Sequence, residues 1–121
     1  MIRVSLRRDA SGRVQELACR GHARFSQPGQ DLVCAGVSAV LGALGLGLTE
    51  VARLPVSLQA GDGLFVVRRP ARWHDSAWDL LLETTVRALQ DLERHYPGFV
   101  RLRRLKPRGI RATDVEDQPT D

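Results

Sequence analysis

A cysteine and a histidine stand twelve residues apart in the one stretch of this sequence that is rich in side chains suited to catalysis. The stretch runs from residue 21 to residue 38 and reads GHARFSQPGQDLVCAGVS. A cysteine thiolate attacks carbonyl carbons, and a neighbouring imidazole can hold the thiolate as an ion pair and later protonate a departing amine. Cys34 and His22 therefore indicate acyl transfer, and the loop between them is long enough to permit their contact.

The residues around Cys34 predict a helix that would favour its thiolate. Residues 32 to 48 carry no charge, and Asp31 just before them is of the type that caps helix N-termini. Cys34 then stands at about the third residue of the helix, where free first-turn amides and the helix dipole stabilise a thiolate. We expect amides near Cys34 and Ala35 to donate hydrogen bonds to the oxyanion that forms during attack.

Two polar side chains near the pair have two interpretations each. Asp31 could orient His22, although helix capping fits its position more directly. Ser38 follows Cys34 by one helical turn, so its hydroxyl could contact the sulfur or the substrate. It could equally bond back to the carbonyl of Cys34. The sequence leaves these alternatives open.

Other uses of the cysteines and histidines are weaker. Without further knowledge, a cysteine in a helix of alanine and valine is more often an inert buried residue than a nucleophile. A zinc site would draw on Cys19, His22 and Cys34, but the first two point to opposite faces of a strand and no fourth ligand is suitably spaced. His74 stands at a helix entrance and His95 in a last turn, where capping or dipole roles are common.

The elements that must position this stretch follow from hydrophobic periodicity. Alternation predicts strands over residues 2–7 and 13–21, the second with a weaker pattern that could hide a bulge. A helix over residues 32–53 comes next, then a hairpin of 56–60 and 64–69, an amphipathic helix from residue 76, and a strand over 99–105. We expect an α+β domain over residues 1–105, a mixed or antiparallel sheet covered by two helices. Residues 106–121 form a tail that is too polar to fold.

Composition indicates a soluble, cytosolic domain. Hydrophobic residues make up 43% and charged residues 26%, which excludes wholesale disorder. Two cysteines are too few for a disulfide scaffold, and the start of the chain lacks the pattern of a signal peptide. The apolar run is near the minimum length for a membrane span, but its four glycines and the strands around it favour a buried helix. A ridge of small residues along it could pack on a sheet or on a second copy: Ala35, Ala39, Ala43 and Gly47.

The stretch from residue 21 to residue 40 resembles the ribosomal-processing cysteine protease Prp family of bacteria. The signature of that family is Gly-His-Ala, five variable residues, Gly, one residue, then Asp-Ile-Val-Cys-Ala-small-Val-Ser-Ala. The matching residues are Gly21, His22, Ala23, Gly29, Asp31, Val33, Cys34, Ala35, Val37, Ser38 and Ala39, with Leu32 in place of isoleucine and Gly36 at the small position. The spacing is reproduced without a gap.

The resemblance implies a cytoplasmic, homodimeric endopeptidase that needs no metal or organic cofactor. It implies that His22 and Cys34 form the catalytic dyad and that residues 23–30 move to admit substrate. It also marks five residues as supporting cap, oxyanion or substrate contacts: Gly21, Gly29, Asp31, Ala35 and Ser38. The implied substrate is ribosomal large-subunit protein twenty-seven, from which family members remove a short N-terminal extension after an aromatic residue.

A function of another class is also consistent with the sequence. Of eighteen cationic residues, seventeen are arginines, and the formal net charge is +4. A non-catalytic ribosome- or RNA-associated assembly factor could use the arginine-rich ends for weak contact with ribosomal RNA. Aromatic residues are only 5% of the chain, so a platform that stacks on bases is poorly supported. Nothing in the sequence favours a membrane partner.

Overall fold

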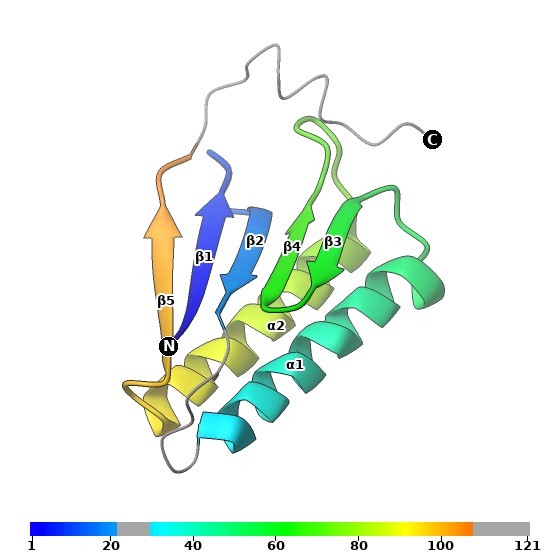
Figure 1. Cartoon of the computed structure of the whole chain (residues 1–121). Coiled ribbons are helices and arrows are strands. Elements are labelled where there is room, and N and C mark those ends of the chain that lie inside the picture. Colours follow the sequence, from blue (N-terminus) through cyan, green and yellow to red (C-terminus); the bar gives the residue numbers. More distant parts are fainter. Residues whose placement is uncertain (22–29, 108–121) are drawn as a thin grey trace.

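The computed structural model describes residues 1–21 and 30–107, without the side chains of Gln30 and Asp31. A five-stranded sheet carries two long helices on one of its faces (Figure 1). In chain order the elements are β1 (Ile2–Arg8), β2 (Val14–Arg20), α1 (Gln30–Leu46), a π-helical turn η1 (Gly47–Val51), β3 (Ser57–Gly61), β4 (Leu64–Arg68), α2 (Ser76–His95) and β5 (Val100–Leu105). The predicted α+β class and order of elements are confirmed, with strand ends that shift by at most one residue.

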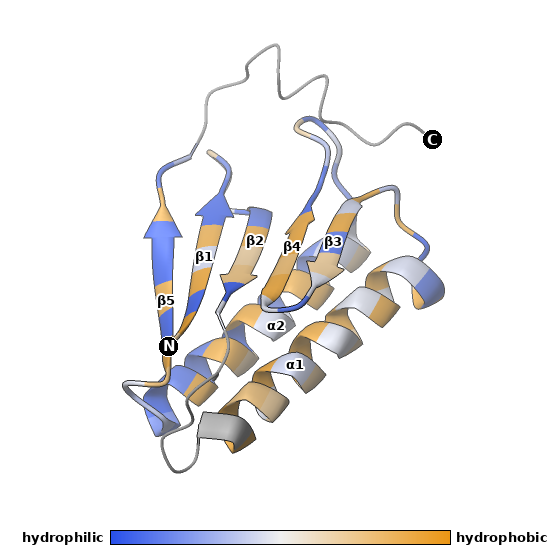
Figure 2. Cartoon of the chain, viewed as in Figure 1, coloured by the Kyte–Doolittle hydropathy of each residue, from blue (hydrophilic) through white to orange (hydrophobic). Residues whose placement is uncertain are grey.

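The strand order in the sheet is β3-β4-β2-β1-β5, which places the N-terminal strand near one edge. All neighbours are antiparallel except β1 and β5, which run parallel. This mixed sheet arises because the two hairpins give antiparallel pairs, whereas β5 reaches β1 only after the chain has crossed the sheet along α2. The strand β1 alternates between hydrophobic and hydrophilic residues, as expected for a sheet with one covered face (Figure 2).

The predicted bulge in β2 is present at Gln15. Arg7 pairs with Glu16 but Arg8 pairs with Val14, so Gln15 is the extra residue. The shift brings Val14 to the same face as Leu17, and both are at most 1% exposed. The side-chain amide of Gln15 donates to the carbonyl of Arg69, 3.0 Å away. Weak alternation in this strand thus reflects a change of face in the middle of the strand.

The core lies between the sheet and the two helices. The helix α2 contributes Trp78, Leu82 and Leu89, each 0% exposed. The helix α1 contributes Val33, Val37, Leu41 and Leu44 to the same cluster. The segment Leu32–Val51 is long and apolar enough to cross a membrane by length and composition, which is weak evidence because the core helix of a soluble protein meets the same test. Its packing in this core supports the predicted role as a cover for the sheet.

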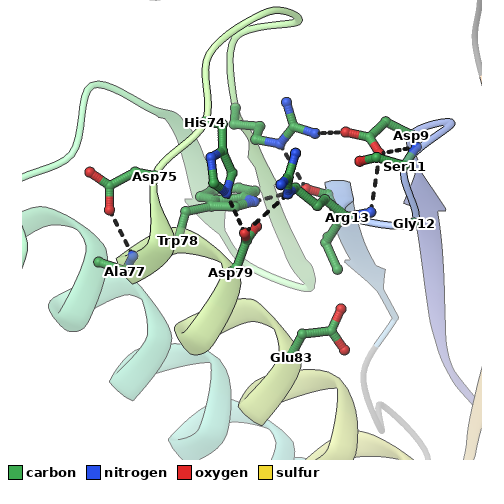
Figure 3. Close-up of polar contacts among 12 residues, drawn as sticks. Asp9, Ser11, Gly12, Arg13, His74, Asp75, Ala77, Trp78, Asp79 and Glu83 are labelled. Carbon is green, nitrogen blue, oxygen red and sulfur yellow. Dashed lines mark hydrogen bonds and ion pairs between the residues drawn. The ribbon is translucent and has the colours of Figure 1, made fainter.

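A buried arginine ties the turn between β1 and β2 to the chain that follows β4. Arg69 is 3% exposed, and its guanidinium donates to Asp9, to the carbonyl of Val14 at 2.9 Å and to that of Trp73 at 2.9 Å. Burial tends to raise the pKa of Asp9, but hydrogen bonds from Ser11 and Arg13 and the charge of Arg69 outweigh it, so the pKa lies below its ordinary value. Figure 3 shows Asp9 next to Ser11.

The histidines at the ends of α2 have structural partners. Asp75 is the N-cap of α2 and accepts from the amide of Ala77 at 2.7 Å. His74, just before it, contacts the carboxylate of Asp79 at 2.5 Å, as Figure 3 shows. At the other end, Nδ1 of His95 lies 2.8 Å from the carbonyl of Asp91. His95 therefore fits the role that its position in the last turn predicted, whereas His74 pairs with Asp79 and does not cap α2, because Asp75 does.

Candidate active site

Cys34 lies on α1 and opens into a cavity between this helix and the β3–β4 side of the sheet. Its side chain is half-buried and packs against the hydrophobic core. The cavity has a volume of about 670 Å³ and opens to solvent. Volumes of about 300–1,000 Å³ are usual for ligand sites, so the cavity is large enough for a peptide segment. Cys34 is therefore a half-exposed thiol in the wall of a groove.

We call this cavity the α1–β3 groove. One wall is formed by the face of α1 that carries Cys34, Ser38, Leu41, Gly42, Gly45 and Leu46, continued by Thr49 of η1. The other wall is formed by the β3–β4 hairpin and the ends of β1 and β2, through Ile2, Cys19, Gly21, Leu58, Ala60, Gly61, Asp62, Gly63, Leu64 and Phe65. Most of these side chains are apolar, and the polar Ser38, Thr49 and Asp62 are spread along the length. Such a lining suits a peptide with apolar side chains.

Two glycines of α1 give the groove its depth. A Cβ placed on Gly42 would meet nothing within 4 Å, because this residue faces open space. A Cβ on Gly45 would lie 3.7 Å from Leu58 and 3.8 Å from Phe65, so the helix comes close to the hairpin there. Each interior glycine costs about 1 kcal/mol of helix stability relative to alanine. Gly42 therefore leaves space in the groove at a cost to the helix.

The strand β3 offers unpaired backbone groups along the groove. It is an edge strand, joined to β4 through a two-residue turn at Asp62 and Gly63. In such a hairpin the pair Gly61 and Leu64 is hydrogen-bonded and every second pair repeats this pattern. Leu58 and Ala60 lie between these pairs, so their amide and carbonyl groups point to the free edge. An extended peptide in the groove can pair with them as an added strand.

Gly21 is required by geometry at the end of β2. Its φ is +104°, and a Cβ on it would lie 2.5 Å from the carbonyl oxygen of Met1. Its amide donates to the carbonyl of Gly63 at 3.0 Å, which ties the end of β2 to the β3–β4 turn. Because residue 22 follows directly, the backbone of Gly21 sets the direction in which the chain leaves β2. The structure therefore requires glycine here for backbone reasons, and the predicted supporting role of Gly21 stays a prediction.

The start of α1 corrects the predicted position of Cys34. The helix begins at Gln30, so Asp31 is its second residue and does not occupy the N-cap position that we expected. Cys34 is then the fifth residue, in the second turn. In an α-helix the amides from this point on donate to carbonyls four residues earlier, so those of Cys34 and Ala35 are engaged within the helix. The expectation that these two amides hold an oxyanion is therefore wrong.

The remaining predicted site residues divide into two groups. Ser38 lines the α1–β3 groove together with Cys34, whereas Ala35 is exposed and is not among the described lining residues. His22, Gly29 and the predicted mobile segment 23–30 lie outside the described residues, apart from the backbone of residue 30. The same is true of most of the predicted tail, residues 108–121. The pairing of His22 with Cys34 stays a prediction.

Cys19 forms part of the opposite wall of the groove. It is 5% exposed on β2, and burial, with a smaller contribution from the charge of Cys34, raises its pKa to about 11. Cys19 therefore stays a neutral thiol near pH 7.

Within residues 1–21 and 30–107 no cluster of three histidine, cysteine or acidic side chains could hold a metal. The zinc ligand set that includes His22 falls partly outside these ranges.

The β3–β4 wall of the groove is the part of the site that the sequence analysis missed. A signal was present, because Leu58 and Ala60 share one face of a predicted strand that pairs with Leu64 and Phe65. What the sequence did not reveal is that this hairpin forms the edge of the sheet beside α1. The sequence also left open whether the ridge of small residues on α1 packs on the sheet or on a second copy of the chain. Ala35, Ala39 and Ala43 are exposed, so they do not pack on the sheet.

Comparison with known proteins identifies the family. The family model described as cysteine protease Prp matches residues 1–101. The chain is 35% identical over 105 residues to the ribosomal processing cysteine protease Prp of Staphylococcus aureus, covering 84% of this chain and 97% of that protein. It is 32% identical over 107 residues to the protein of that name from Bacillus subtilis, covering 84% and 96%.

Solved structures agree with the sequence comparison. A crystal structure of the essential ribosomal processing protease Prp from S. aureus, in complex with a substrate peptide, superposes with a TM-score of 0.74 at 29% identity and covers 87% of this chain and all of that one. A second structure of that protease, with a covalently linked product peptide, gives a TM-score of 0.71 at 30% identity, with coverage of 87% and 100%. The enzymatic prediction is confirmed over the non-catalytic alternative, and the chain belongs to the cysteine protease Prp family.

Proposed function

We propose that this protease removes an N-terminal extension from ribosomal large-subunit protein twenty-seven, with Cys34 as nucleophile and His22 as acid and base. The observation that carries the proposal is the placement of Cys34, a half-exposed thiol at one end of an apolar groove. The relatives support it, because the protease from S. aureus has been solved both with a substrate peptide and with a covalently linked product peptide. A covalent product fits attack by a cysteine.

The proposed reaction proceeds in two steps. The Cys34 thiolate adds to the scissile carbonyl carbon, the C–N bond breaks, and His22 gives its proton to the departing amine. Water, deprotonated by His22, then adds to the thioester and releases the new carboxyl end and the thiol. Because α1 leaves free only the amides before Val33, we place the oxyanion donors there or on the peptide segment that precedes the helix.

The α1–β3 groove would hold the residues next to the cleaved bond. From Cys34 to Leu46 the helix rises about 18 Å, which matches an extended peptide of about five residues. The free backbone groups of Leu58 and Ala60 would bind the peptide main chain, while the apolar walls would hold alternate side chains. An extension with apolar and aromatic side chains before the cleaved bond fits this chemistry.

The experiment that tests this proposal uses the ribosomal protein of the same organism. Purified enzyme is incubated with full-length protein twenty-seven, and intact mass spectrometry follows its N-terminus. We expect a single shortened product in which the new N-terminus lies directly after an aromatic residue. The same enzyme preparation is checked on a separate peptide with apolar residues. If it cleaves that peptide but leaves protein twenty-seven unchanged, the assignment of protein twenty-seven is contradicted.

The proposed chemistry involves a thiol, an imidazole and water, so we expect cleavage to continue in the presence of a metal chelator such as EDTA. We also propose that the enzyme acts in the cytoplasm, where ribosomes are assembled and both thiols stay reduced. A chelator that abolishes cleavage, with recovery on addition of a divalent metal, would contradict the proposal that no metal is needed.

We further propose that the enzyme is a homodimer. The support is an uncharged face on α1, where Ala35, Ala39 and Ala43 are exposed beside Leu32, which is 68% exposed. Small residues allow two helices to approach closely. Light scattering should give twice the chain mass for the wild type and the chain mass for Ala39→Glu, because that substitution would bury charges between the two helices. A wild-type monomer would contradict the proposal.

A further inference from the structure

The face of the sheet opposite the helices carries a concentration of positive charge. Both helices lie on one side of the sheet (Figure 1), and the core residues Ile2, Val4 and Leu6 of β1 point toward them. Successive side chains of a strand point to opposite faces, so Arg3 and Arg7 point the other way. We call this second surface the open face.

The strand register extends the open face across four strands. Its arginines are Arg3 and Arg7 on β1, Arg20 on β2, Arg68 on β4, and Arg101 and Arg103 on β5. The acidic residue that shares this face on the paired strands is Glu16, which lies 4.0 Å from Arg68. From β4 to β5 the patch measures about 14 Å, and from Arg3 to Arg7 about 13 Å.

Three of these arginines stand side by side in one row. Arg3 pairs with Arg20 on one side and with Arg101 on the other. Like charges directly opposite each other on neighbouring strands destabilise a sheet. No ion pair or side-chain hydrogen bond joins Arg3, Arg20 or Arg101 to any residue in the described part of the chain. The row therefore carries an electrostatic cost that a bound anion would relieve.

Protection of the sheet edge does not explain this row. Charged side chains on an edge strand prevent unwanted pairing, and that role accounts for Arg101 and Arg103 on β5. The edge amide of Leu102 is in addition occupied by the carboxylate of Glu93, 2.9 Å away. Arg3 and Arg20, however, lie on β1 and β2, which have partner strands on both sides. Edge protection therefore does not explain the charges of Arg3 and Arg20.

We propose that the open face binds the phosphate backbone of helical RNA. Guanidinium groups match phosphates in geometry and charge, and a patch without aromatic residues can read a backbone but cannot stack on bases. The choice of RNA rests on the proposed function, because a protease that trims a ribosomal protein meets its substrate next to ribosomal RNA. A second copy of this chain is a poor occupant, because it would place arginines against arginines.

The groove and the open face lie on opposite sides of the sheet, so RNA binding and peptide cleavage can be measured separately. The probe is an RNA duplex of about 20 base pairs, long enough to cover the patch. Its affinity for the full chain is measured by fluorescence anisotropy at several salt concentrations. The test variant is Arg101→Gln/Arg103→Gln on the open face, and Arg20→Gln at the other end of the row gives a second reading. The matched control is Arg87→Gln/Arg94→Gln on α2, which removes the same charge from the helical side.

A plot of log affinity against log salt concentration should have a slope of about −3 to −5 for the wild type. The open-face double variant should reduce the magnitude of that slope by about 1.5 to 2, which makes it shallower. Two lost phosphate contacts correspond to about a tenfold to thirtyfold loss of affinity near 0.15 M salt. Peptide cleavage should stay unchanged in both double variants. Equal losses in the open-face and α2 variants would overturn the proposal, as would binding to phosphatidylserine vesicles in preference to RNA. Loss of RNA binding with intact cleavage would support it even if protein twenty-seven were not the substrate.

Discussion

Filling the α1–β3 groove at Gly42 should block cleavage without harming the fold. A Cβ at this position meets nothing within 4 Å, so a phenylalanine side chain can extend into the groove without a clash against the protein backbone. Glycine costs about 1 kcal/mol relative to alanine in a helix interior, and phenylalanine recovers part of that difference. Gly42→Phe should therefore be at least as stable as the wild type.

The expected loss of activity follows from the space that the ring takes. Burial of one large apolar side chain contributes about 1.5–3 kcal/mol, and a substrate side chain displaced from the groove loses that contribution. This corresponds to a decrease of about tenfold to 150-fold in kcat/KM. Gly42→Ala is the matched control: it should gain about 1 kcal/mol of stability and raise Tm by about 4 °C, with cleavage close to that of the wild type.

The assay combines thermal unfolding with cleavage of a fluorogenic peptide that carries apolar residues before the cleaved bond. Stability and activity should move in opposite directions in Gly42→Phe. Wild-type cleavage by a folded Gly42→Phe enzyme would refute the assignment of this groove to the substrate. Loss of activity in Gly42→Ala as well would show that the glycine acts through helix flexibility and not through space.

Three further predictions concern residues around the groove and in the turn between β1 and β2. At pH 8 iodoacetamide should modify Cys34 at least about tenfold faster than Cys19. The reason is that burial and, to a smaller degree, the charge of Cys34 raise the pKa of Cys19 to about 11. Equal modification rates by mass spectrometry would contradict the buried position of Cys19. Gly21→Ala should lower the free energy of unfolding by about 1–3 kcal/mol and should also impair cleavage. Gly12→Ala should lower only stability, because Gly12 also has a positive φ but a Cβ there would meet nothing within 4 Å. Intact cleavage by Gly21→Ala would argue against a role of Gly21 in directing the chain after β2. The pKa of Asp9 is lowered in the folded protein, so the Asp9 carboxylate stabilises the fold fully above about pH 4 and loses this effect as the pH falls through its pKa in the folded state. The difference in free energy of unfolding between the wild type and Asp9→Asn should therefore shrink in acid. A difference that grows in acid would contradict the direction of the pKa shift.

Local patterns in the sequence were sufficient for the order of elements and for the family. The alternation of Ile2, Val4 and Leu6 predicted β1, and the uncharged run before Glu50 predicted α1. These predictions succeeded because each depends on a period of two residues or on a long apolar stretch that the core must bury. The motif around Cys34 identified the family because its spacing is specific.

The parts that were wrong or that the sequence left open depend on one residue or on contacts between distant segments. The first residue of α1 differs by two positions from the expected one, and that difference engages the amides of Cys34 and Ala35 in the helix. The order of strands, which makes β3 an edge and collects arginines from β1, β2, β4 and β5, is set by the packing of the whole sheet. No local pattern encodes it.

The most direct test of the proposed chemistry compares two cysteine substitutions on one peptide substrate. Cys34→Ala should lower kcat/KM by at least about a thousandfold while the thermal unfolding transition stays close to that of the wild type. Cys19→Ala removes a thiol from the opposite wall of the same groove and should retain cleavage within a few-fold. Turnover by Cys34→Ala at a rate near that of the wild type would contradict the role of Cys34 as nucleophile.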